Sequence, residues 1–444
     1  MSCWDGEALT DDANGTSRDT ATVVEESQSI VFPPTMKKNE TSTRTASTFL
    51  VDDTSAAVSA TKRKAQEQEQ GKAVAEENKL KAKASIWLSG LFLFYLSFYI
   101  HLWSSFHQHR EDSIVRHAAR IEPDAVEPGR TASAISTDML STSNASVVET
   151  GIYIDRITDV SIVDSSWIAD FYLWFRWTDA TINPGQTFHV IDGNLESKQD
   201  LEFEEKDGVF YSQHRVEAKF TKFFNVYRFP RDNHLMTLRI EDSKMDHHDL
   251  VYVADVDSSR VSSRVKIPGY AIVKIWAVSK LHGYKSHRGN PWADTSVQRN
   301  FSQFIGALAI ERPDWGLFLL MFQGVFTAVV IAMLAMMVSP HNDARYDLGI
   351  GAVFTVVAAT YITMTHIPLT GSFTLADVVT AMSLMTVFLT LCQTYVARQW
   401  CTELDPVTGE KVVKNRWLDF IALAIFVVGY SAVVVGCATA ASIQ

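Results

Sequence analysis

Long apolar runs almost without charge occupy two parts of the chain. One covers residues 84–106, and the others lie between residue 314 and the C-terminus. A helix needs about 20 apolar residues to cross the ~30 Å hydrocarbon core of a bilayer. Uncharged runs of this length do not recur within one soluble domain, so we predict five transmembrane helices. Their predicted ranges are 84–106, 314–340, 345–368, 376–397 and 417–443.

A different pattern fills residues 147–313, where apolar and polar residues alternate. β-branched and aromatic residues dominate these runs, which is typical of strands. Turn sequences separate them, such as DGN at 192–194 and KDG at 206–208. About ten short strands at this spacing predict a β-sandwich. The predicted fold is an all-β sandwich followed by an all-α bundle of four transmembrane helices, with an extra transmembrane helix on its N-terminal side.

Polar segments flank the first predicted membrane helix. Residues 1–83 are rich in Ser, Thr, Ala, Glu and Lys. They bury too little apolar surface to offset chain entropy, so we predict a disordered tail. Within it, residues 62–83 suit a charged helix leading into the membrane. Residues 107–146 are predicted to be a polar linker.

The basic residues of the short loops predict the orientation, because Lys and Arg gather on the cytoplasmic side of a membrane. Four lysines lie at 72–83, and four Lys or Arg residues lie in the predicted cytoplasmic loop 398–416. We expect a plasma or bacterial inner membrane protein whose N-terminus is cytoplasmic and whose sandwich and C-terminus are outside. A signal peptide is the alternative for residues 84–106, but their length and their distance from the N-terminus favour an uncleaved anchor.

Composition narrows the function class. The net charge of −11 argues against a nucleic-acid partner. No cysteine lies between residues 4 and 391, so the sandwich folds without disulfides. The sequence has no nucleotide-binding Gly-rich loop, HExxH, GxSxG or CxxC pair, so we expect neither an enzyme nor a cofactor. His247 and His248, between two aspartates, suit a metal or a pH sensor, but a solvated loop is the stronger interpretation, and no metal site is predicted.

Five motifs in order resemble the pentameric ligand-gated ion channels, the Cys-loop receptor family. The stretch FFNVYRFPRDNHLMTLRIE at 223–241 is similar to the family's signature loop, with Lys222 and Met236 where the bracketing cysteines would fall. The chain therefore looks like the cysteine-free branch common in prokaryotes. The resemblance covers about 147–444. Its other motifs are WFRWTD with Trp177 and Asp179, Arg312 before the second membrane segment, ARYDLGIGAVFTVVA at 344–358, and IPLTGSFTLAD at 367–377.

The resemblance implies a homopentamer that conducts inorganic ions through a lipid bilayer. Steps of three and four residues place one set of side chains on a single face of the third membrane segment, and five copies turn each position into a ring. Phe354 falls at the family's hydrophobic gate, and Tyr361 would form a second constriction. The predicted pore-lining residues are Asp347, Gly351, Phe354, Ala358, Tyr361 and Thr365.

Asp343 and Asp347 at the inner mouth predict a preference for cations, because acidic rings attract them. Arg345 lies between them, and helical geometry turns it away from the pore. Solvated loop charge is the alternative for both aspartates. Packing against neighbouring helices is the alternative for Phe354 and Tyr361.

The resemblance also implies residues that couple the sandwich to the pore and residues that bind the ligand. The lower loops of the sandwich should touch the membrane helices, and Asp232 is expected to pair with Arg312 where partial burial strengthens the attraction. The coupling candidates are Asp164, Phe229, Pro230, Asp232, Arg312 and Pro368.

The agonist is expected between sandwiches, among aromatic side chains. An amine is one candidate because aromatic faces attract cations, but Ser243 stands where the family has an aromatic residue. Burial in the sandwich core is the alternative for Tyr172 and Trp174. The candidate ligand residues are Tyr172, Trp174, Tyr284 and Trp292.

Three functions stay open. The first is a ligand-gated ion channel that prefers cations. The second is a non-conducting membrane sensor of the same architecture that signals through its cytoplasmic tail. The third is an enzyme or transporter carrying an accessory sandwich, for which the membrane segments offer no acid pairs or broken helices.

Overall fold

The structure is a computed structural model that describes residues 51–126, 144–286, 299–365, 373–404, 411–413 and 416–442. The chain divides into two units, Met1–Ala73 and Val74–Gln444. Trp292, Pro368, the first fifty residues of the predicted tail and residues 127–143 of the predicted linker lie outside the described residues.

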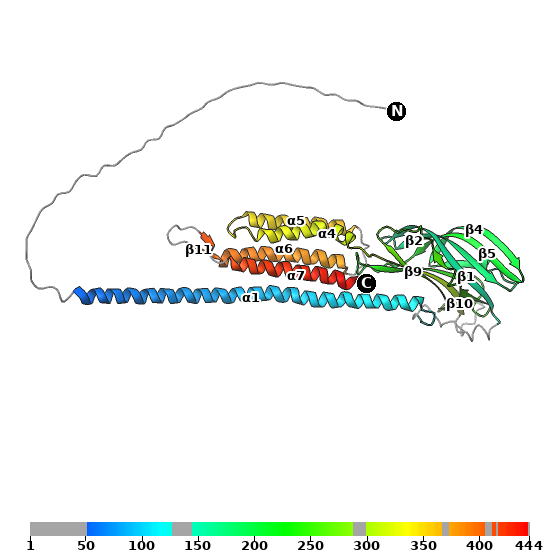
Figure 1. Cartoon of the computed structure of the whole chain (residues 1–444), viewed down its shortest axis with the longest axis horizontal. Helices are drawn as coiled ribbons and strands as arrows, with labels where there is room; N and C mark the ends of the chain where they lie inside the picture. Colours follow the sequence, from blue (N-terminus) through cyan, green and yellow to red (C-terminus); the bar gives the residue numbers. More distant parts are fainter. Residues whose placement is uncertain are drawn as a thin grey trace, which may run out of the picture. The chain divides into compact units, whose positions relative to one another are not determined.

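Ten strands in the described residues form two sheets, which confirms the predicted sandwich (Figure 1). One sheet has the order β4-β5-β2-β1-β7, with β8 paired to β1, and the other has the order β3-β6-β10-β9. A short helix, α3 (Pro184–Thr187), precedes β3. The strands are β1 (Ser146–Ser161), β2 (Ser166–Trp177), β3 (Phe188–Ile191), β4 (Gly193–Lys206), β5 (Val209–Thr221), β6 (Asn233–Asp242), β7 (Leu250–Ala254), β8 (Arg260–Val261), β9 (Ala271–Tyr284) and β10 (Arg299–Glu311).

Along the strands, side chains that point into the core alternate with side chains that point outward, and the inward ones form the core between the sheets. On β2, Phe171, Leu173 and Phe175 are fully buried, and they face Leu238 of β6 and Phe304 of β10 within one cluster. Successive side chains of a strand point to opposite faces, so the intervening residues lie on the outer face of each sheet. The predicted turn at 206–208 joins β4 to β5, with positive φ at Asp207 and Gly208, as tight hairpins require.

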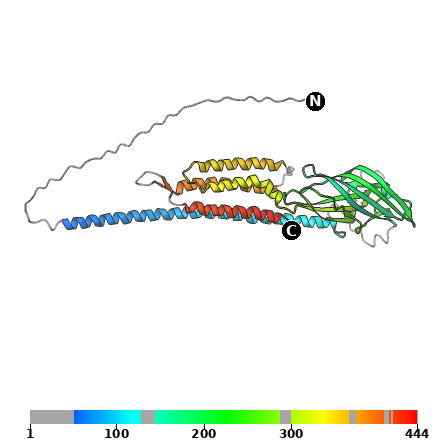
Figure 2. The ribbon, with the colours of Figure 1, turned by 45° about the horizontal axis from the view of Figure 1, so that its top comes forward.

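Four long apolar helices follow the sandwich and lie side by side in both ribbon views (Figures 1 and 2). They are α4 (Gly316–Ala335), α5 (Ala344–Met364), α6 (Leu375–Trp400) and α7 (Trp417–Ala441). The start of α6 is a capping box in which Thr374 and Asp377 satisfy each other's backbone N–H groups. The predicted loop 398–416 contains a small hairpin of β11 (Thr402–Leu404) and β12 (Lys411–Val413).

The helix before the sandwich, α1 (Val51–Ile121), is much longer than predicted. The charged helix predicted at 62–83 is confirmed, whereas the predicted disorder is wrong for residues 51–61 and the predicted linker is wrong for 107–121, because these stretches are also helical. No proline interrupts them before Pro123, and a proline is where a helix is expected to end. Within residues 107–121 Ser113 is buried, as is Phe106 just before them, so tertiary contacts outweigh the polar composition of this stretch.

Helix α1 packs on α6 and α7. The Tyr95 hydroxyl is hydrogen-bonded to Thr386 Oγ1 at 2.8 Å. The Tyr95 ring lies against Gly429 of α7, where an added Cβ would stand 2.5 Å from the ring. Glycine is therefore needed at this crossing for the two helices to approach closely.

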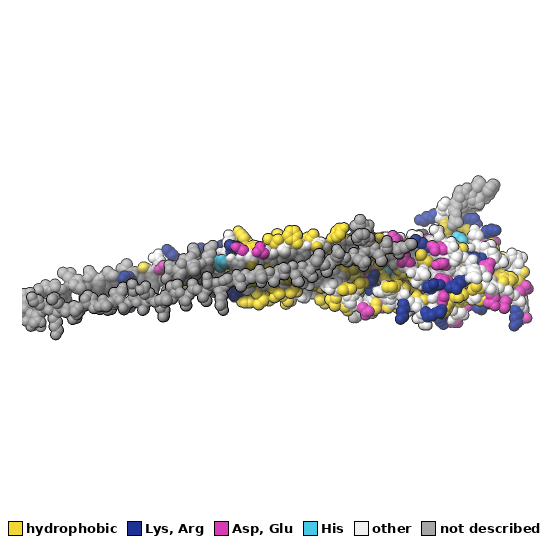
Figure 3. All heavy atoms as spheres, turned by 90° about the horizontal axis from the view of Figure 1, so that it is seen from above, with side chains coloured by type: hydrophobic (Ala, Val, Ile, Leu, Met, Phe, Trp, Pro, Cys, Tyr) yellow, Lys and Arg dark blue, Asp and Glu magenta, His cyan; other side chains and the backbone are white. Residues whose placement is uncertain are grey.

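Among the described residues, five helices, α1 and α4 to α7, are long and apolar enough to cross a membrane. Large apolar side chains are exposed along them, including Leu320 at 65% and Val428 at 69%. Figure 3 shows hydrophobic side chains over the helices and charged side chains gathered on the sandwich. Contiguous exposed apolar surface of this kind marks contact with lipid or with another protein.

Candidate functional site

Helix α5 has two opposite faces. Its buried residues are Arg345, Gly349, Ala352, Val356 and Thr363, and their spacing of three, four and seven residues makes one stripe along the helix. The predicted pore-lining residues lie on the exposed side: Phe354 is 71% exposed and Tyr361 is 74% exposed. Asp347, Gly351, Ala358 and Thr365 are also exposed. Phe354 and Tyr361 therefore do not pack against the other described helices of the same chain.

The three charged residues at the start of α5 separate in space. Asp343 and Asp347 are exposed, and Arg398 reaches an Asp343 oxygen at 3.2 Å. Arg345 is fully buried. Its side chain therefore points away from the exposed face that carries the aspartates, as helical geometry predicted.

Arg345 is held by a buried polar network. Its guanidinium forms two hydrogen bonds with Asp419 of α7, at 2.9 and 3.0 Å, and donates to Thr394 Oγ1 at 3.0 Å. Gln393 of α6 donates to the same Asp419 at 2.9 Å and accepts a 2.7 Å hydrogen bond from the Trp87 indole of α1. The network thus connects the start of α5 to three other helices.

Residues 222–232, which we call the junction loop, contact the ends of several helices. The Leu375 N–H at the start of α6 donates to Tyr227 O at 2.8 Å. Arg228 donates to Ala441 O at the end of α7, at 2.8 Å. Arg231 donates to the carbonyl groups of residues 312–314 just before α4, at 3.2–3.3 Å, and its guanidinium lies 4.8 Å from the Trp315 ring.

Helix α1 also reaches the junction loop. Ser105 Oγ is hydrogen-bonded to the Tyr227 hydroxyl at 2.9 Å, and the His109 ring lies 3.7 Å from the Tyr227 ring. Phe224 and Phe229 are buried in the same cluster as the helix cores, and the Phe229–Pro230 peptide bond is cis. The loop therefore joins the sandwich to α1, α4, α6 and α7.

The predicted pair at the end of this loop forms in the structure. Arg312 Nε donates to Asp232 Oδ1 at 2.9 Å, and Asp232 is 1% exposed. His234 Nε2 lies 2.6 Å from Asp232 Oδ2. The Tyr270 hydroxyl accepts from Arg312 at 2.8 Å, and the guanidinium stacks 4.0 Å from the Tyr270 ring. We call these four residues the Asp232 cluster.

The charges of the Asp232 cluster follow from its burial. Burial alone would raise the pKa of Asp232, but the positive charge that His234 gains in acid, its hydrogen bond and the Arg312 guanidinium outweigh this effect and bring the pKa to about 2. Burial lowers the pKa of His234 despite its contact with Asp232. Arg312 already balances the carboxylate, so a protonated His234 would add an unbalanced buried charge, and we assign the neutral form at pH 7.

The remaining coupling candidate, Asp164, lies in the exposed β1–β2 turn. Its carboxylate accepts a hydrogen bond from Ser161 Oγ at 2.7 Å. Neighbouring Val160 and Ile162 pack against the buried cluster that contains the helix cores. The turn therefore also lies at the junction, although its carboxylate is bound locally.

The three predicted ligand residues that the structure describes, Tyr172, Trp174 and Tyr284, lie on two separate surfaces. Tyr172 and Trp174 lie on the outer face of β2, and the alternative of burial holds for Trp174 but not for Tyr172. Tyr172 is half-buried, and the Arg215 guanidinium lies 5.7 Å from the Tyr172 ring. Trp174 is buried, and its indole N–H donates to Asp255 at 3.3 Å. Tyr284 lies at the end of β9 in the other sheet and donates to Glu241 at 2.8 Å. One chain does not bring these aromatic side chains together.

The paired histidines form no recognisable metal centre. The His247 and His248 rings lie 3.9 Å apart, and His247 contacts the backbone of Asn300. Across the described part of the chain, no group of three or more His, Cys, Asp or Glu side chains is arranged to hold a metal ion.

Several residues of the junction were missed from the sequence. His234 and Tyr270 complete the Asp232 cluster, Arg228 and Arg231 hold helix ends, and Asp419 neutralises Arg345. The one signal for Asp419 was a lone acidic residue at the start of an apolar helix. Comparison with models of known protein families finds no match, and neither does comparison with curated proteins.

Proposed function

We propose that the chain is one subunit of a homopentameric ligand-gated ion channel that prefers cations. The helices α4 to α7 form its four-helix transmembrane bundle, α1 adds a fifth crossing, and α5 lines the pore. The N-terminus is cytoplasmic, and the sandwich and C-terminus are extracellular or periplasmic. A small molecule bound between neighbouring sandwiches opens the pore.

The contacts of the junction loop carry this proposal. A ligand-gated channel needs a rigid connection through which the sandwich moves the helix ends. The junction loop bonds to the start of α6, to the end of α7 and to the residues before α4, while the Asp232 cluster fixes its last residue to Arg312. These contacts place one loop where a shift of the sandwich would reach three helices together.

The exposed face of α5 supports the pore assignment. A helix that packs on lipid alone carries apolar residues there, whereas this face begins with Asp347 and ends with Thr365 on either side of Phe354. A ring of apolar side chains closes a narrow pore by excluding water. In a pentamer, polar side chains at both ends of the pore and five Phe354 side chains in the middle suit a gated aqueous path.

The separation of the aromatic residues supports a ligand site between subunits. Tyr172 belongs to the six-stranded sheet and Tyr284 to the four-stranded sheet of the same sandwich. Side chains on opposite outer faces meet only when two sandwiches lie next to each other. A ring of subunits provides this arrangement at every interface.

A second candidate function is a non-conducting sensor of the same architecture. The observation that favours it is the Trp87–Gln393–Asp419–Arg345 network, which connects α1 to the start of α5. In a sensor, movement of α5 would pass through this network to α1 and onward to the cytoplasmic tail.

Recording of ionic current separates the two functions. The purified chain is reconstituted in planar bilayers and compared with Phe354→Ser, which wets the proposed gate, and with Phe388→Ser. Phe388 is an exposed aromatic residue of α6 at 57% and serves as the matched control. We expect a resting current for Phe354→Ser alone. The absence of unitary current from every variant, with folding intact, would exclude the channel and leave the sensor.

A further inference from the structure

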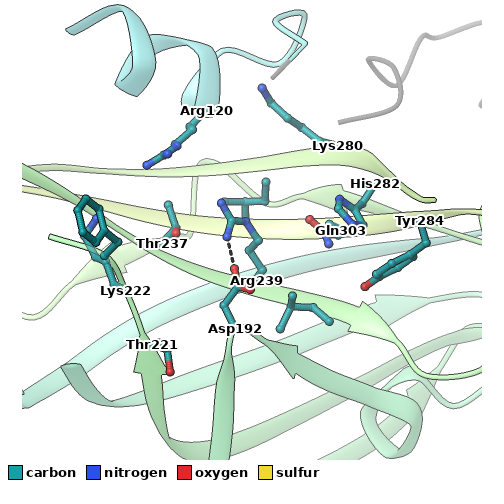
Figure 4. A pocket seen from close by; sticks show the side chains of 13 residues that line it. Arg120, Asp192, Thr221, Lys222, Thr237, Arg239, Lys280, His282, Tyr284 and Gln303 are labelled. Carbon is teal, nitrogen blue, oxygen red and sulfur yellow. Dashed lines mark hydrogen bonds and ion pairs between the residues drawn. The ribbon is translucent and has the colours of Figure 1, made fainter. Parts of the chain in front are cut away.

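The end of α1 is attached to the four-stranded sheet by polar contacts. Lys280 of β9 is 1% exposed, and its ammonium group donates to the carbonyl oxygens of Ala119 at 2.7 Å and Ala125 at 2.8 Å. Figure 4 shows Arg120 and the end of α1 above the strand that carries Lys280. Arg120 and side chains of β6, β9 and β10 border a cavity of about 400 Å³ there. Because a cavity lies at this place, the described contacts that hold the end of α1 are mainly polar.

Just before this end, α1 meets Asn233, the first residue of β6. Ser113 Oγ donates to Asn233 Oδ1 at 3.4 Å, and the amide nitrogen of Asn233 lies 3.5 Å from His117 Nδ1. Ser113 and His117 are four residues apart and therefore share one face of the helix. Arg228 of the junction loop also donates to Asn233 Oδ1. We call these four residues the Asn233 cluster.

The Asn233 cluster determines which atom of each side chain donates. A guanidinium has only N–H donors, so Arg228 must face the amide oxygen of Asn233. The amide NH₂ group of Asn233, which is also only a donor, then faces His117 Nδ1. That nitrogen must accept, so His117 is neutral and carries its proton on Nε2. Turning the amide over would not change this requirement, because its NH₂ group would then face Arg228.

The surroundings of His117 also favour its neutral form. The titratable and charged groups that face it in the described residues are Arg120 of α1, Lys222 and Arg228 of the junction loop, and His234 of β6, and none of them is a carboxylate. Burial and then these groups lower the pKa of His117, which lies beyond the predicted membrane segment, to about 3. The contact is therefore stable above the ordinary histidine pKa of about 6.5 and weakens as the pH falls below it.

We propose that His117 is a pH-sensitive switch that holds the end of α1 on the sandwich while it is neutral and releases it when it is protonated. A proton on Nδ1 turns the hydrogen bond with Asn233 into a contact between two donors. Asn233 cannot adapt, because Arg228 and Ser113 hold its oxygen. A released ring in water binds a proton with its ordinary affinity, so each pH unit below about 6.5 favours release about tenfold.

The Asn233 cluster connects α1 to the end of α7 as well. The guanidinium of Arg228 that binds Asn233 also donates to Ala441 O at 2.8 Å. Asn233 stands between Asp232 and His234 of the Asp232 cluster. Release of α1 would therefore remove bonds from the residue where the junction loop enters β6. An effect of acid on a pore rests on the proposed function, whereas the switch itself does not.

Amide hydrogen exchange of the full-length chain in neutral detergent tests the switch at pH 7.0 and pH 5.5, after correction for intrinsic exchange rates. A polar helix end that loses its tertiary contacts opens more often. In the wild type we expect residues 107–121 to exchange about tenfold faster at pH 5.5, while residues 378–397 of α6 stay unchanged. The amide oxygen of His117→Gln accepts from Asn233 at either pH, so this variant should show no increase. His117→Lys is charged at both pH values and should exchange rapidly at both.

Three other histidines serve as controls. His109 lies on the same helix against Tyr227, His234 belongs to the Asp232 cluster, and His248 is exposed. The variants His109→Gln, His234→Gln and His248→Gln should each keep the wild-type response to pH, and thermal unfolding at pH 7 verifies the fold of every variant. The proposal is overturned if the wild type shows no increase at pH 5.5, if His117→Gln keeps the increase, or if one of the three control variants abolishes it. None of these results depends on channel activity.

Discussion

Single residues at the junction matter because their charges are buried. Asp232 and Arg312 are held out of water together with His234 and Tyr270. Removing one partner of a buried ion pair leaves the other charge uncompensated. Effects of substitutions here should therefore depend strongly on whether one partner or both are changed.

The Asp232–Arg312 contact predicts strong energetic coupling. Asp232→Asn and Arg312→Gln are each expected to lower the unfolding free energy by about 3–5 kcal/mol and to impair channel opening, because each leaves a buried charge without its partner. The double variant should lose less unfolding free energy than the two single variants lose together, with a coupling energy of about 0.5–3 kcal/mol. A double-mutant cycle on unfolding and on open probability measures this. Strict additivity in both measurements would remove the pair from the mechanism.

His234 predicts a loss of stability in mild acid. Its pKa is lowered in the folded chain, so the unfolded chain binds a proton more readily below the ordinary histidine pKa of about 6.5. The stabilisation is therefore complete above that pH and is lost as the pH falls below it. Asp232, with a pKa of about 2, loses its own contribution only at much lower pH.

Thermal unfolding at pH 7 and pH 5 measures this effect. The decrease in unfolding temperature should be smaller for His234→Gln than for the wild type. It should not vanish, because burial also lowers the pKa of His214. His248→Gln, at an exposed histidine, is the control and should keep the wild-type pH dependence. An unchanged decrease in His234→Gln would contradict the assigned neutral state.

At the scale of elements, α1 and α5 are connected through the buried network around Arg345. Trp87 comes from α1, Gln393 and Thr394 come from α6, and Asp419 comes from α7. A buried guanidinium satisfied by a bidentate carboxylate fixes the relative position of two helices with precise geometry. The register of α5 against α7 therefore depends on one ion pair.

Asp419→Ala is expected to destabilise the helices strongly. It leaves Arg345 buried without its carboxylate, which costs about 3–5 kcal/mol. Asp343→Asn removes an equal charge from an exposed pair with Arg398, and surface pairs contribute about 0–1 kcal/mol. Thermal unfolding of the two purified variants makes the comparison. Equal unfolding temperatures would show that the Arg345–Asp419 pair contributes little.

At the scale of the whole molecule, the proposed pore and the proposed ligand site each need more than one copy of the chain. Phe354 and Tyr361 present an exposed aromatic face with no partner in the described part of the chain, and Tyr172 and Tyr284 lie on different sheets. Both features become explicable when five copies surround an axis. The oligomer would cover the face of α5 and bring two sandwiches together.

The exposed acids at the start of α5 predict selectivity for cations. In the proposed pentamer, Asp343 and Asp347 would form negative rings, while Arg345, which is buried, would contribute no side chain to the lumen. Reversal potentials in a NaCl gradient should track sodium in the wild type. In the Asp343→Asn and Asp347→Asn double variant the permeability ratio should move toward one. A wild-type reversal potential that follows chloride would refute the assignment.

The sequence by itself determined most of the elements and which of their faces are buried. Periods of two and of about 3.6 residues depend only on local geometry, so the strands of the sandwich and the opposite faces of α5 were predictable from spacing. The Asp207–Gly208 turn could also be predicted from local sequence, because Asp and Gly are residue types that adopt positive φ in tight turns. The pairing of Asp232 with Arg312 was predictable only with the family resemblance.

Tertiary structure decided the rest, because the partners lie far apart in the chain. Residues 107–121 are polar enough to suggest a linker, and only their packing against the junction loop makes them part of a helix. Lys280 is separated from the carbonyl groups of Ala119 and Ala125 by more than 150 residues, and Arg345 from Asp419 by 74. Neither composition nor periodicity identifies such partners, since burial is what gives each contact its energy.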